Sequence, residues 1–196
     1  MSKKKPRSQE QSGAVYQLKV TLLEVKPAIW RRFQVRANIK LADLHYCLQA
    51  VMDGWQDCHL HQFQINGEFY GPPCDGIGFD PEWKDLNENR FRLNGLIVPG
   101  CKFEYIYDMG DNWTHEILVE KELPPEHGVK YPICIGGTSA CPPEDCGGPW
   151  GYPDFIAAIS DPKHPDHEDM VEWIGDDFDP TAFDIDAVNG NLREMA

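Results

Sequence analysis

Histidines and acidic residues recur beside predicted turns, and their side chains could bind a metal ion or transfer a proton. His59 and His61 have one residue between them in a predicted strand, and Asp108, Asp111 and His115 stand near the end of a predicted hairpin. Imidazole nitrogens and carboxylate oxygens serve as zinc ligands and as general acids and bases. Metal binding and proton transfer are therefore candidate chemistries for these five residues. The alternative is structural: a polar histidine pair on the surface, and an aspartate that closes a turn.

Three cysteines lie in a segment of unusual composition that runs from Cys134 to Tyr152. Its five glycines and three prolines disfavour a helix or a central strand, so we expect an ordered, shaped loop. Cys134, Cys141 and Cys146 have six and four residues between them. Zinc sites favour cysteines separated by two to four residues, so the spacing supports a metal site only in its second interval.

Glu144 and Asp145 lie between Cys141 and Cys146. Either carboxylate could be the general base of a hydrolytic metal site, and a bound divalent cation would let an acidic surface hold a phosphate. The alternative is that they accept backbone amide hydrogens and stabilise a turn. A cysteine nucleophile is disfavoured, because neighbouring carboxylates raise the pKa of a thiol.

The distribution of charge limits the partners that the chain could bind. The net charge is −14, and residues 104–196 contain four basic and twenty-one acidic residues. Phosphate backbones are bound largely through Lys and Arg, so this half should repel nucleic acid. We expect direct contact with nucleic acid only through the basic residues 1–13 or through Arg31, Arg32 and Arg36, for which surface salt bridges are the favoured role. A protein or a small molecule is the expected partner.

Length and composition predict the cellular class and the domain organisation. With 196 residues, the chain is long enough to bury a core. It has neither a long apolar stretch nor the apolar core of a signal peptide, and its seven cysteines are an odd number. We therefore expect a cytoplasmic protein without a membrane segment. Its predicted parts are a basic disordered tail over residues 1–13 and a single α+β domain over residues 14–196.

Hydrophobic patterns indicate the elements that must position the candidate residues. Apolar and polar residues alternate in several stretches, which predicts strands, and leucines three and four apart predict an amphipathic helix that ends at Gly54. Asn66-Gly67 and the stretch from Gly110 to Asn112 predict two hairpin turns. The predicted strands cover residues 14–25, 29–35, 59–65, 90–93, 101–107 and 113–121, and the predicted helix covers residues 41–53. These elements indicate an antiparallel, hairpin-built sheet packed by one helix.

The remaining segments are expected to be loops and short helices. Residues 71–89 are rich in Pro, Gly, Asp and Asn, which predicts a long loop that Trp83 could pin. Pro153 is expected to begin a short helix, because proline suits the first helical position. Short acidic helices are expected near the C-terminus over residues 164–175, after Asp179-Pro180 and after Asp184.

Several motifs in order make the chain resemble a known family. They are I-W-R-R, L-A-D-L-H, H-L-H-x-F, Y-D-x-G-D-x-W-x-H, A-C-P-P-E-D-C-G-G and the closing W-x-G-x-x-F-D-P-x-x-F-D. Over residues 15–192 the chain resembles the plasmid pRiA4b ORF-three-like family. The resemblance implies an α+β fold, occurrence in bacteria and archaea, and an association with plasmids and mobile elements. It implies no established activity. Some members are labelled transposon resolvases, but no serine or tyrosine in this sequence stands in a context that resembles a recombinase nucleophile.

Two functions follow as hypotheses. The first is a non-enzymatic binding or accessory module that uses the loop from Cys134 to Tyr152. The second is a metal-dependent hydrolase or nuclease-like enzyme that uses a divalent metal. Its candidate catalytic residues are Asp111, His115, Glu144 and Asp145, and its candidate metal ligands are His59, His61, Asp111, His115, Cys134, Cys141 and Cys146.

Overall fold

The computed structural model describes residues 13–73, 85–175 and 178–195. Residues 1–12 of the basic tail and Trp83 lie outside the described residues. Among the described helices, none is both long enough and apolar enough to cross a membrane.

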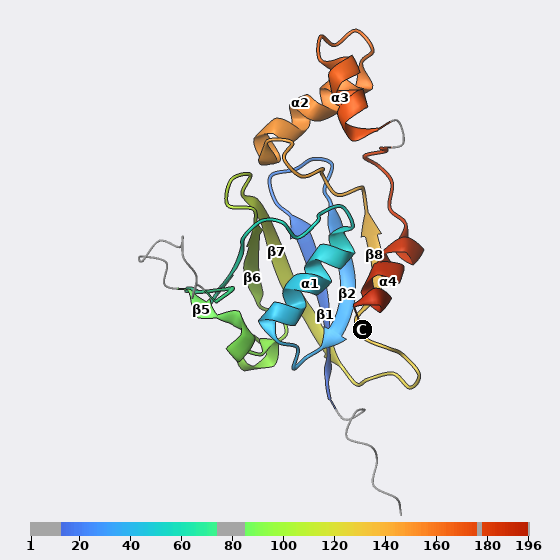
Figure 1. The fold of residues 1–196 in the computed structure, drawn as a ribbon. Helices are drawn as coiled ribbons and strands as arrows, with labels where there is room; N and C mark the ends of the chain where they lie inside the picture. Colours follow the sequence, from blue (N-terminus) through green and yellow to red (C-terminus); the bar gives the residue numbers. More distant parts are fainter. Residues whose placement is uncertain (1–12, 74–84, 176–177, 196) are drawn as a thin grey trace, which may run out of the picture.

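An eight-stranded sheet forms the centre of the fold (Figure 1). Its strand order is β5-β4-β3-β6-β7-β1-β2-β8, and neighbouring strands are antiparallel except for β4 and β5. The strands are β1 (Val15–Leu22), β2 (Trp30–Arg36), β3 (His61–Ile65), β4 (Glu68–Gly71), β5 (Leu86–Asn87), β6 (Lys102–Tyr107), β7 (Trp113–Leu123) and β8 (Ile133–Thr138). The mixed α+β class is thus as expected.

The two predicted hairpins are confirmed. Asn66 and Gly67 both have positive φ angles between β3 and β4, as a tight hairpin turn requires. In the second hairpin, Tyr105 of β6 lies opposite His115 of β7. Because β6 also pairs with β3, the two hairpins lie side by side in one sheet, with Tyr107 opposite His61.

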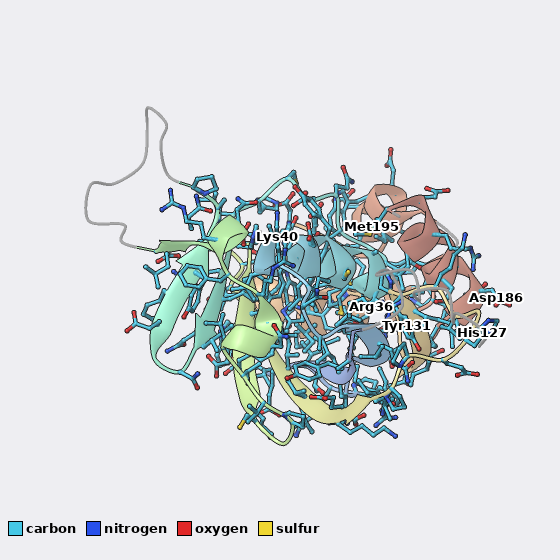
Figure 2. The ribbon with its side chains drawn as sticks, turned by 90° about the horizontal axis from the view of Figure 1, so that it is seen from below. Arg36, Lys40, His127, Tyr131, Asp186 and Met195 are labelled. Atoms are coloured by element: carbon cyan, nitrogen blue, oxygen red, sulfur yellow. The ribbon has the colours of Figure 1, made fainter. Side chains whose placement is uncertain are left out.

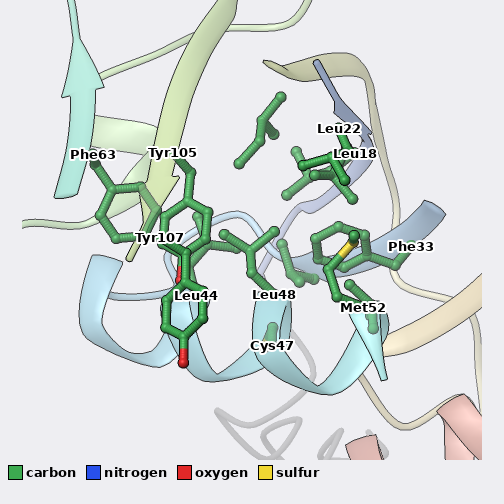
Figure 3. Packing of buried hydrophobic residues seen from close by; sticks show 14 of the residues in the cluster. Leu18, Leu22, Phe33, Leu44, Cys47, Leu48, Met52, Phe63, Tyr105 and Tyr107 are labelled. Carbon is green, nitrogen blue, oxygen red and sulfur yellow. The ribbon is translucent and has the colours of Figure 1, made fainter. Parts of the chain in front are cut away.

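Helix α1 (Leu41–Met52) covers one face of the sheet (Figures 1 and 3). Its leucines pack against aromatic and aliphatic side chains of the strands in a single buried cluster (Figure 3). The cluster includes Leu18, Phe33, Leu44, Leu48, Phe63 and Tyr105, all fully buried. Each such side chain contributes about 1.5–3 kcal/mol when it leaves water, so this face holds the core.

Three further helices follow β8 in the chain. They are α2 (Gly148–Ser160), α3 (His167–Ile174) and α4 (Ile185–Glu194). Helices α2 and α3 pack on each other beyond one end of the sheet, whereas α4 lies beside α1 and β8 (Figure 1). The Asn189 side chain accepts a hydrogen bond from the Cys134 amide and donates one to the Cys134 carbonyl, at 2.8 and 3.0 Å. This clamp occupies the outer edge of β8 at that position.

The prediction of one loop from Cys134 to Tyr152 is wrong at both ends. Strand β8 continues to Thr138, and α2 begins at Gly148, so the loop itself comprises residues 139–147. Glycine is useful in β8, because a Cβ at Gly137 would lie 2.7 Å from the ring of Phe183. Pro153 lies inside α2, not at its start.

Other boundaries also differ from the predictions. Helix α1 ends at Met52, and the residue that caps it, in the left-handed conformation, is Asp53 and not Gly54. The first strand stops at Leu22, and residues 90–93 form no strand but join two short 3-10 turns, η2 (Glu88–Arg90) and η3 (Leu93–Gly95). Asp179 caps a turn through the Thr181 amide instead of starting a helix. Local signals mark where the chain turns, but not which residue makes the turn.

Candidate functional site

Residues 139–147, here called the clasp loop, dock against the segment that follows α1. A Cβ on Gly54 would lie 2.9 Å from the Cβ of Cys141, so this close approach needs glycine. Next along the chain, the indole of Trp55 donates a hydrogen bond of 3.1 Å to the Pro142 carbonyl. At the other end of the loop, a Cβ on Gly148 would collide with the backbone of Asp111. The clasp loop is therefore held against both the α1–β3 connection and the β6–β7 turn.

This docking brings three distant segments together around His59. The His59 Nε2 lies 3.7 Å from Asp108 Oδ2 and 3.6 Å from Asp145 Oδ1. It is shielded from solvent and makes no hydrogen bond with the described residues. The side chain comes from the entry to β3, Asp108 from the end of β6, and Asp145 from the clasp loop. Such an arrangement could hold a cation or transfer a proton.

Glu144 joins the clasp loop to the same place. Its Oε1 accepts hydrogen bonds from the Tyr107 hydroxyl at 2.5 Å and from the Gln56 amide at 3.1 Å. Its Oε2 faces the Cys58 thiol at 3.6 Å. Burial, followed by the Glu144 hydrogen bond, raises the pKa of Tyr107, and the Cys58 pKa is raised by desolvation and then by Glu144. The tyrosine and the thiol are thus protonated at neutral pH.

The predicted site residues separate into those that converge and those that do not. His59, Glu144 and Asp145 meet, together with Cys58 and Asp108, and they form two groups of ligand atoms that lie within 4.8 Å of one another. Asp108 was expected near Asp111 and His115 at the end of the hairpin, whereas Cys58 was not predicted, although it directly precedes His59 in the D-C-H stretch. Its position next to a candidate ligand was the available signal.

His61 does not join His59. It points into the core, where its Nε2 lies 2.8 Å from the buried carboxylate of Glu88. Its ring stacks at 3.5 Å on the ring of His45, whose Nε2 in turn lies 2.7 Å from Asp57 Oδ1 and whose Nδ1 lies 2.8 Å from the Tyr105 hydroxyl. Burial and the neighbouring His61 lower the pKa of His45 to about 4, so this imidazole is neutral. Neither His45 nor Glu88 was predicted as a site residue, although His45 ends the L-A-D-L-H motif, because their partners Asp57 and His61 lie 12 and 27 residues away in the sequence.

His115 is also separate from the His59 group. It is completely buried, its Nδ1 lies 3.2 Å from the Tyr105 carbonyl, and its ring meets the edge of Trp55. Burial lowers its pKa to about 4. Asp111 lies beside Gly148 and Cys146, and its Oδ2 is buried without a hydrogen-bond partner among the described residues.

The three predicted cysteines do not gather into one of these ligand groups. Cys134 is in β8, where its thiol faces the carbonyls of Arg32 and Gly136. Cys141 is packed under Gly54, and burial raises its pKa well above the usual value. Burial, followed by the negative charge of Asp111, raises the pKa of Cys146 to about 12. These thiols stay protonated and serve packing.

A cleft of about 570 Å³ opens beside the clasp loop. Its lining includes Trp173 and Ile174 of α3 and Phe178, together with the acidic residues Glu144 and Asp145. Phe155 of α2 supports the two aromatic residues, because it packs edge-to-face on both rings. The ionisable residues that line the cleft are acids or cysteines, namely Asp53, Cys58, Cys141, Glu144, Asp145 and Asp179.

The three arginines expected at the surface have different roles. Arg31 is buried, which contradicts the surface salt bridge, and it donates to the carbonyls of Val51 and Thr138 at 2.8 and 2.7 Å. It thereby ties the end of α1 to β8. Arg32 forms the expected ion pair, with Glu120, through two hydrogen bonds of 2.8 Å. Arg36 lies over the ring of Tyr131, at the end of the molecule opposite α2 and α3 (Figure 2).

Comparisons with known proteins give the chain its relatives. The family model described as plasmid pRiA4b ORF-3-like protein matches residues 14–187. The uncharacterised protein y4hQ of Sinorhizobium fredii is 39% identical over 189 residues, which cover 94% of this chain and 93% of that protein. The crystal structure of a protein of unknown function, MM3350 from Methanosarcina mazei, matches with a TM-score of 0.79 and 40% identity, over 89% of this chain and 97% of that chain. The chain therefore belongs to the plasmid pRiA4b ORF-3-like family.

Proposed function

We propose that the chain is a non-enzymatic binding module whose cleft holds a positively charged segment of a partner protein. The observation that carries this proposal is the lining of the cleft, which combines aromatic rings with carboxylates and, among the described residues, includes no Lys or Arg. A cationic side chain would gain from both, since aromatic faces attract ammonium and guanidinium groups and carboxylates pair with them. The partner is therefore expected to present Lys or Arg.

Trp173 is the side chain best placed to anchor such a partner. It is 48% exposed, although tryptophan is a large apolar residue, and it lines the cleft in contact with Phe155. Exposed tryptophans often supply much of the binding energy at protein interfaces. Asp53 also lines the cleft: its Oδ1 accepts a hydrogen bond from the Asn191 side chain at 2.6 Å, and among the described residues it has no ion-pair partner.

The chemistry of the thiols supports binding over catalysis. Cys141 and Cys146 flank the acidic part of the clasp loop, and both have raised pKa values, which suppresses nucleophilic attack. His45 and His115 are buried and neutral, with their rings inside the core.

Calorimetric titration with short peptides would test the proposal. A Lys- and Arg-rich peptide should bind and a Glu-rich peptide of equal length should not. Trp173→Ala should weaken binding roughly tenfold or more. Asp53→Asn should weaken it to a smaller extent. Trp150→Ala is the matched control, since Trp150 is 81% exposed on α2 but does not line the cleft, and Asp186→Asn on α4 controls for net charge. Equal loss in the control variants would overturn the proposal, because it would mean that only the overall charge attracts the peptide.

Metal-dependent hydrolysis is the second candidate, and the position of His59 between two carboxylates favours it. A metal ion there could activate a water molecule at the edge of the cleft. Release of nitrophenol from bis(4-nitrophenyl) phosphate with added zinc or manganese would test this function. Turnover that His59→Ala abolishes would favour the hydrolase over the binding module.

A further inference from the structure

We propose that His59, Asp108 and Asp145 bind a divalent transition-metal ion, with zinc as the preferred ion. This inference goes beyond the proposed partner cleft and does not depend on it. The three side chains bring one nitrogen and two oxygens within 4.8 Å of one another from three separate segments of the chain. Cys58 and Glu144 form a second group of the same size that shares His59.

The distances from His59 Nε2 are close to those of ligands that share an ion and too long for hydrogen bonds. The gaps of 3.6 and 3.7 Å from His59 Nε2 to the two carboxylates exceed the length of a hydrogen bond. Two atoms that each lie about 2.0–2.2 Å from a tetrahedral zinc ion are roughly 3.3–3.6 Å apart. Because the three ligand atoms lie within 4.8 Å of one another, a closure of the group would complete three coordination bonds.

His59 Nε2 needs such a partner. This nitrogen is shielded from solvent and makes no hydrogen bond with the described residues, although a ring nitrogen is a strong donor or acceptor. The ring itself is fixed by an edge-to-face contact with Tyr107 at 5.8 Å. A cation in front of Nε2 would satisfy a polar atom that is otherwise removed from water without compensation.

The two carboxylates are positioned in advance. Asp108 has a left-handed φ of 59°, and its Oδ1 accepts a hydrogen bond from the Gly110 amide at 2.8 Å, which leaves Oδ2 to face His59. Asp145 also has a φ of 59°, within the clasp loop that Gly54 and Trp55 hold in place. Both conformations are uncommon for residues other than glycine, so the surrounding structure maintains them.

The charge of the site also calls for a cation. Among the described residues, the ion-pair contacts of Asp108 and Asp145 are with His59 and not with any Lys or Arg. Glu144 and the Cys58 thiol add further negative or ionisable groups at the same place. Imidazole and thiol donors favour zinc and related ions over magnesium, which prefers an all-oxygen shell.

Zinc titration of the full chain tests the proposal. The protein is purified without chelator or metal-affinity resin, stripped by dialysis against a chelator, and titrated with zinc against a chromophoric competitor. We expect one zinc ion per chain, bound more tightly than magnesium. His59→Ala weakens zinc binding roughly 100-fold or more, whereas His164→Ala leaves it unchanged within about twofold. His164 is the matched control, because it is as half-buried as His59, with 30% of its side chain exposed against 28%, and it also lies near a carboxylate, that of Asp166 at 3.8 Å.

Asp145→Asn is a second test variant, chosen so that the proposal does not depend on the folding of His59→Ala. The Asp145 side chain is 74% exposed, so the change should leave circular dichroism and thermal unfolding intact while it weakens zinc binding. Cobalt substitution gives a second readout, since the visible spectrum of bound cobalt should change in Asp145→Asn and in His59→Ala but not in His164→Ala. Zinc affinity that is the same in His59→Ala, Asp145→Asn and the wild-type chain would overturn the proposal. These measurements involve no peptide, so their failure would leave the proposed cleft untouched.

Discussion

Two histidine clusters lie near each other in this fold and contain the same chemical groups, yet only one of them is internally complete. In the core, His45 and His61 stack on each other, and each has a ring nitrogen within 2.8 Å of a carboxylate. At the clasp loop, His59 stands 3.6 and 3.7 Å from its carboxylates. The core cluster makes hydrogen bonds that stabilise the fold, while the loop cluster has a nitrogen and carboxylates free for a ligand.

The difference arises from where the partners come from. The core pair sits on α1 and β3, next to Tyr105 of β6, and regular elements hold these residues at hydrogen-bonding distance. The loop cluster collects its members from the ends of strands and from an irregular segment. In these two clusters, the satisfied histidines therefore lie on regular elements, and the available one lies where a strand begins beside the clasp loop. The following variants and conditions test this contrast, in order of decreasing effect on stability.

Glu88→Ala should cause the largest loss of stability, because it leaves the buried His61 without its partner. Breaking a buried pair of this kind costs about 3–5 kcal/mol of unfolding free energy. Urea unfolding would measure it, with Glu116→Ala as the control, since Glu116 pairs with Lys102 at the surface. A surface pair contributes about 0–1 kcal/mol, so equal losses in the two variants would contradict the role of the core cluster.

Acid should destabilise the core cluster in a defined pH range. The pKa of His45 and that of His115 are lowered to about 4 in the folded chain from a usual value of 6.5. The unfolded chain therefore binds more protons between these values, and the stability contributed by the neutral rings is complete above pH 6.5 and lost as the pH falls through 4. Each histidine accounts for about 3 kcal/mol at most.

Unfolding free energies measured from pH 7 to pH 4 would test this dependence. His45→Gln should flatten the decrease, because glutamine does not titrate. His115→Gln should do the same for the second ring. A decrease that keeps its full slope in both variants would show that other groups cause it.

Zinc should stabilise the wild-type chain but not the His59→Ala variant. An ion at 100 times its dissociation constant adds about 2.7 kcal/mol to the unfolding free energy of a protein that binds it only when folded. Thermal unfolding with and without zinc measures this gain. A folded His61→Ala variant should keep this gain in stability, because His61 belongs to the core cluster. Loss of the gain in that variant would mean that His59 and His61 contribute to one zinc site.

Gly54→Ala should have the smallest effect on stability and a clear effect on the site. The added methyl group would press on Cys141 from 2.9 Å, and overpacking of this kind costs about 1–3 kcal/mol. The clasp loop would move away from Trp55, so zinc affinity should fall while the core cluster stays intact. Gly95→Ala is the control, since a Cβ there meets open space; equal zinc affinities in the two variants would exclude loop docking as the cause.

Much of the sheet could be predicted from local patterns. The Asn66-Gly67 turn and the alternation through Tyr105 and Tyr107 depend on neighbours a few residues away, and both appear in the fold. The leucine spacing of α1 is local in the same sense, apart from the exact end of the helix at Asp53. Alternation along β2 places Arg31 on the same face as Phe33 and Val35, and all three are buried. Local patterns could not show what satisfies the buried guanidinium, because its partners at Val51 and Thr138 lie far away in the sequence.

The fold class, the two hairpins, the α1 helix, the excess of acidic residues and the family of this chain all follow from the sequence. Which histidine is available depends on long-range packing. His59, His61 and His115 look alike in sequence, but strand pairing directs the last two into the core. The close approach at Gly54 brings the clasp loop to His59 alone. The physical reason is that the groups that can hydrogen-bond to a buried ring nitrogen come from segments far apart in the chain, so only the packed fold determines whether such a nitrogen has a partner.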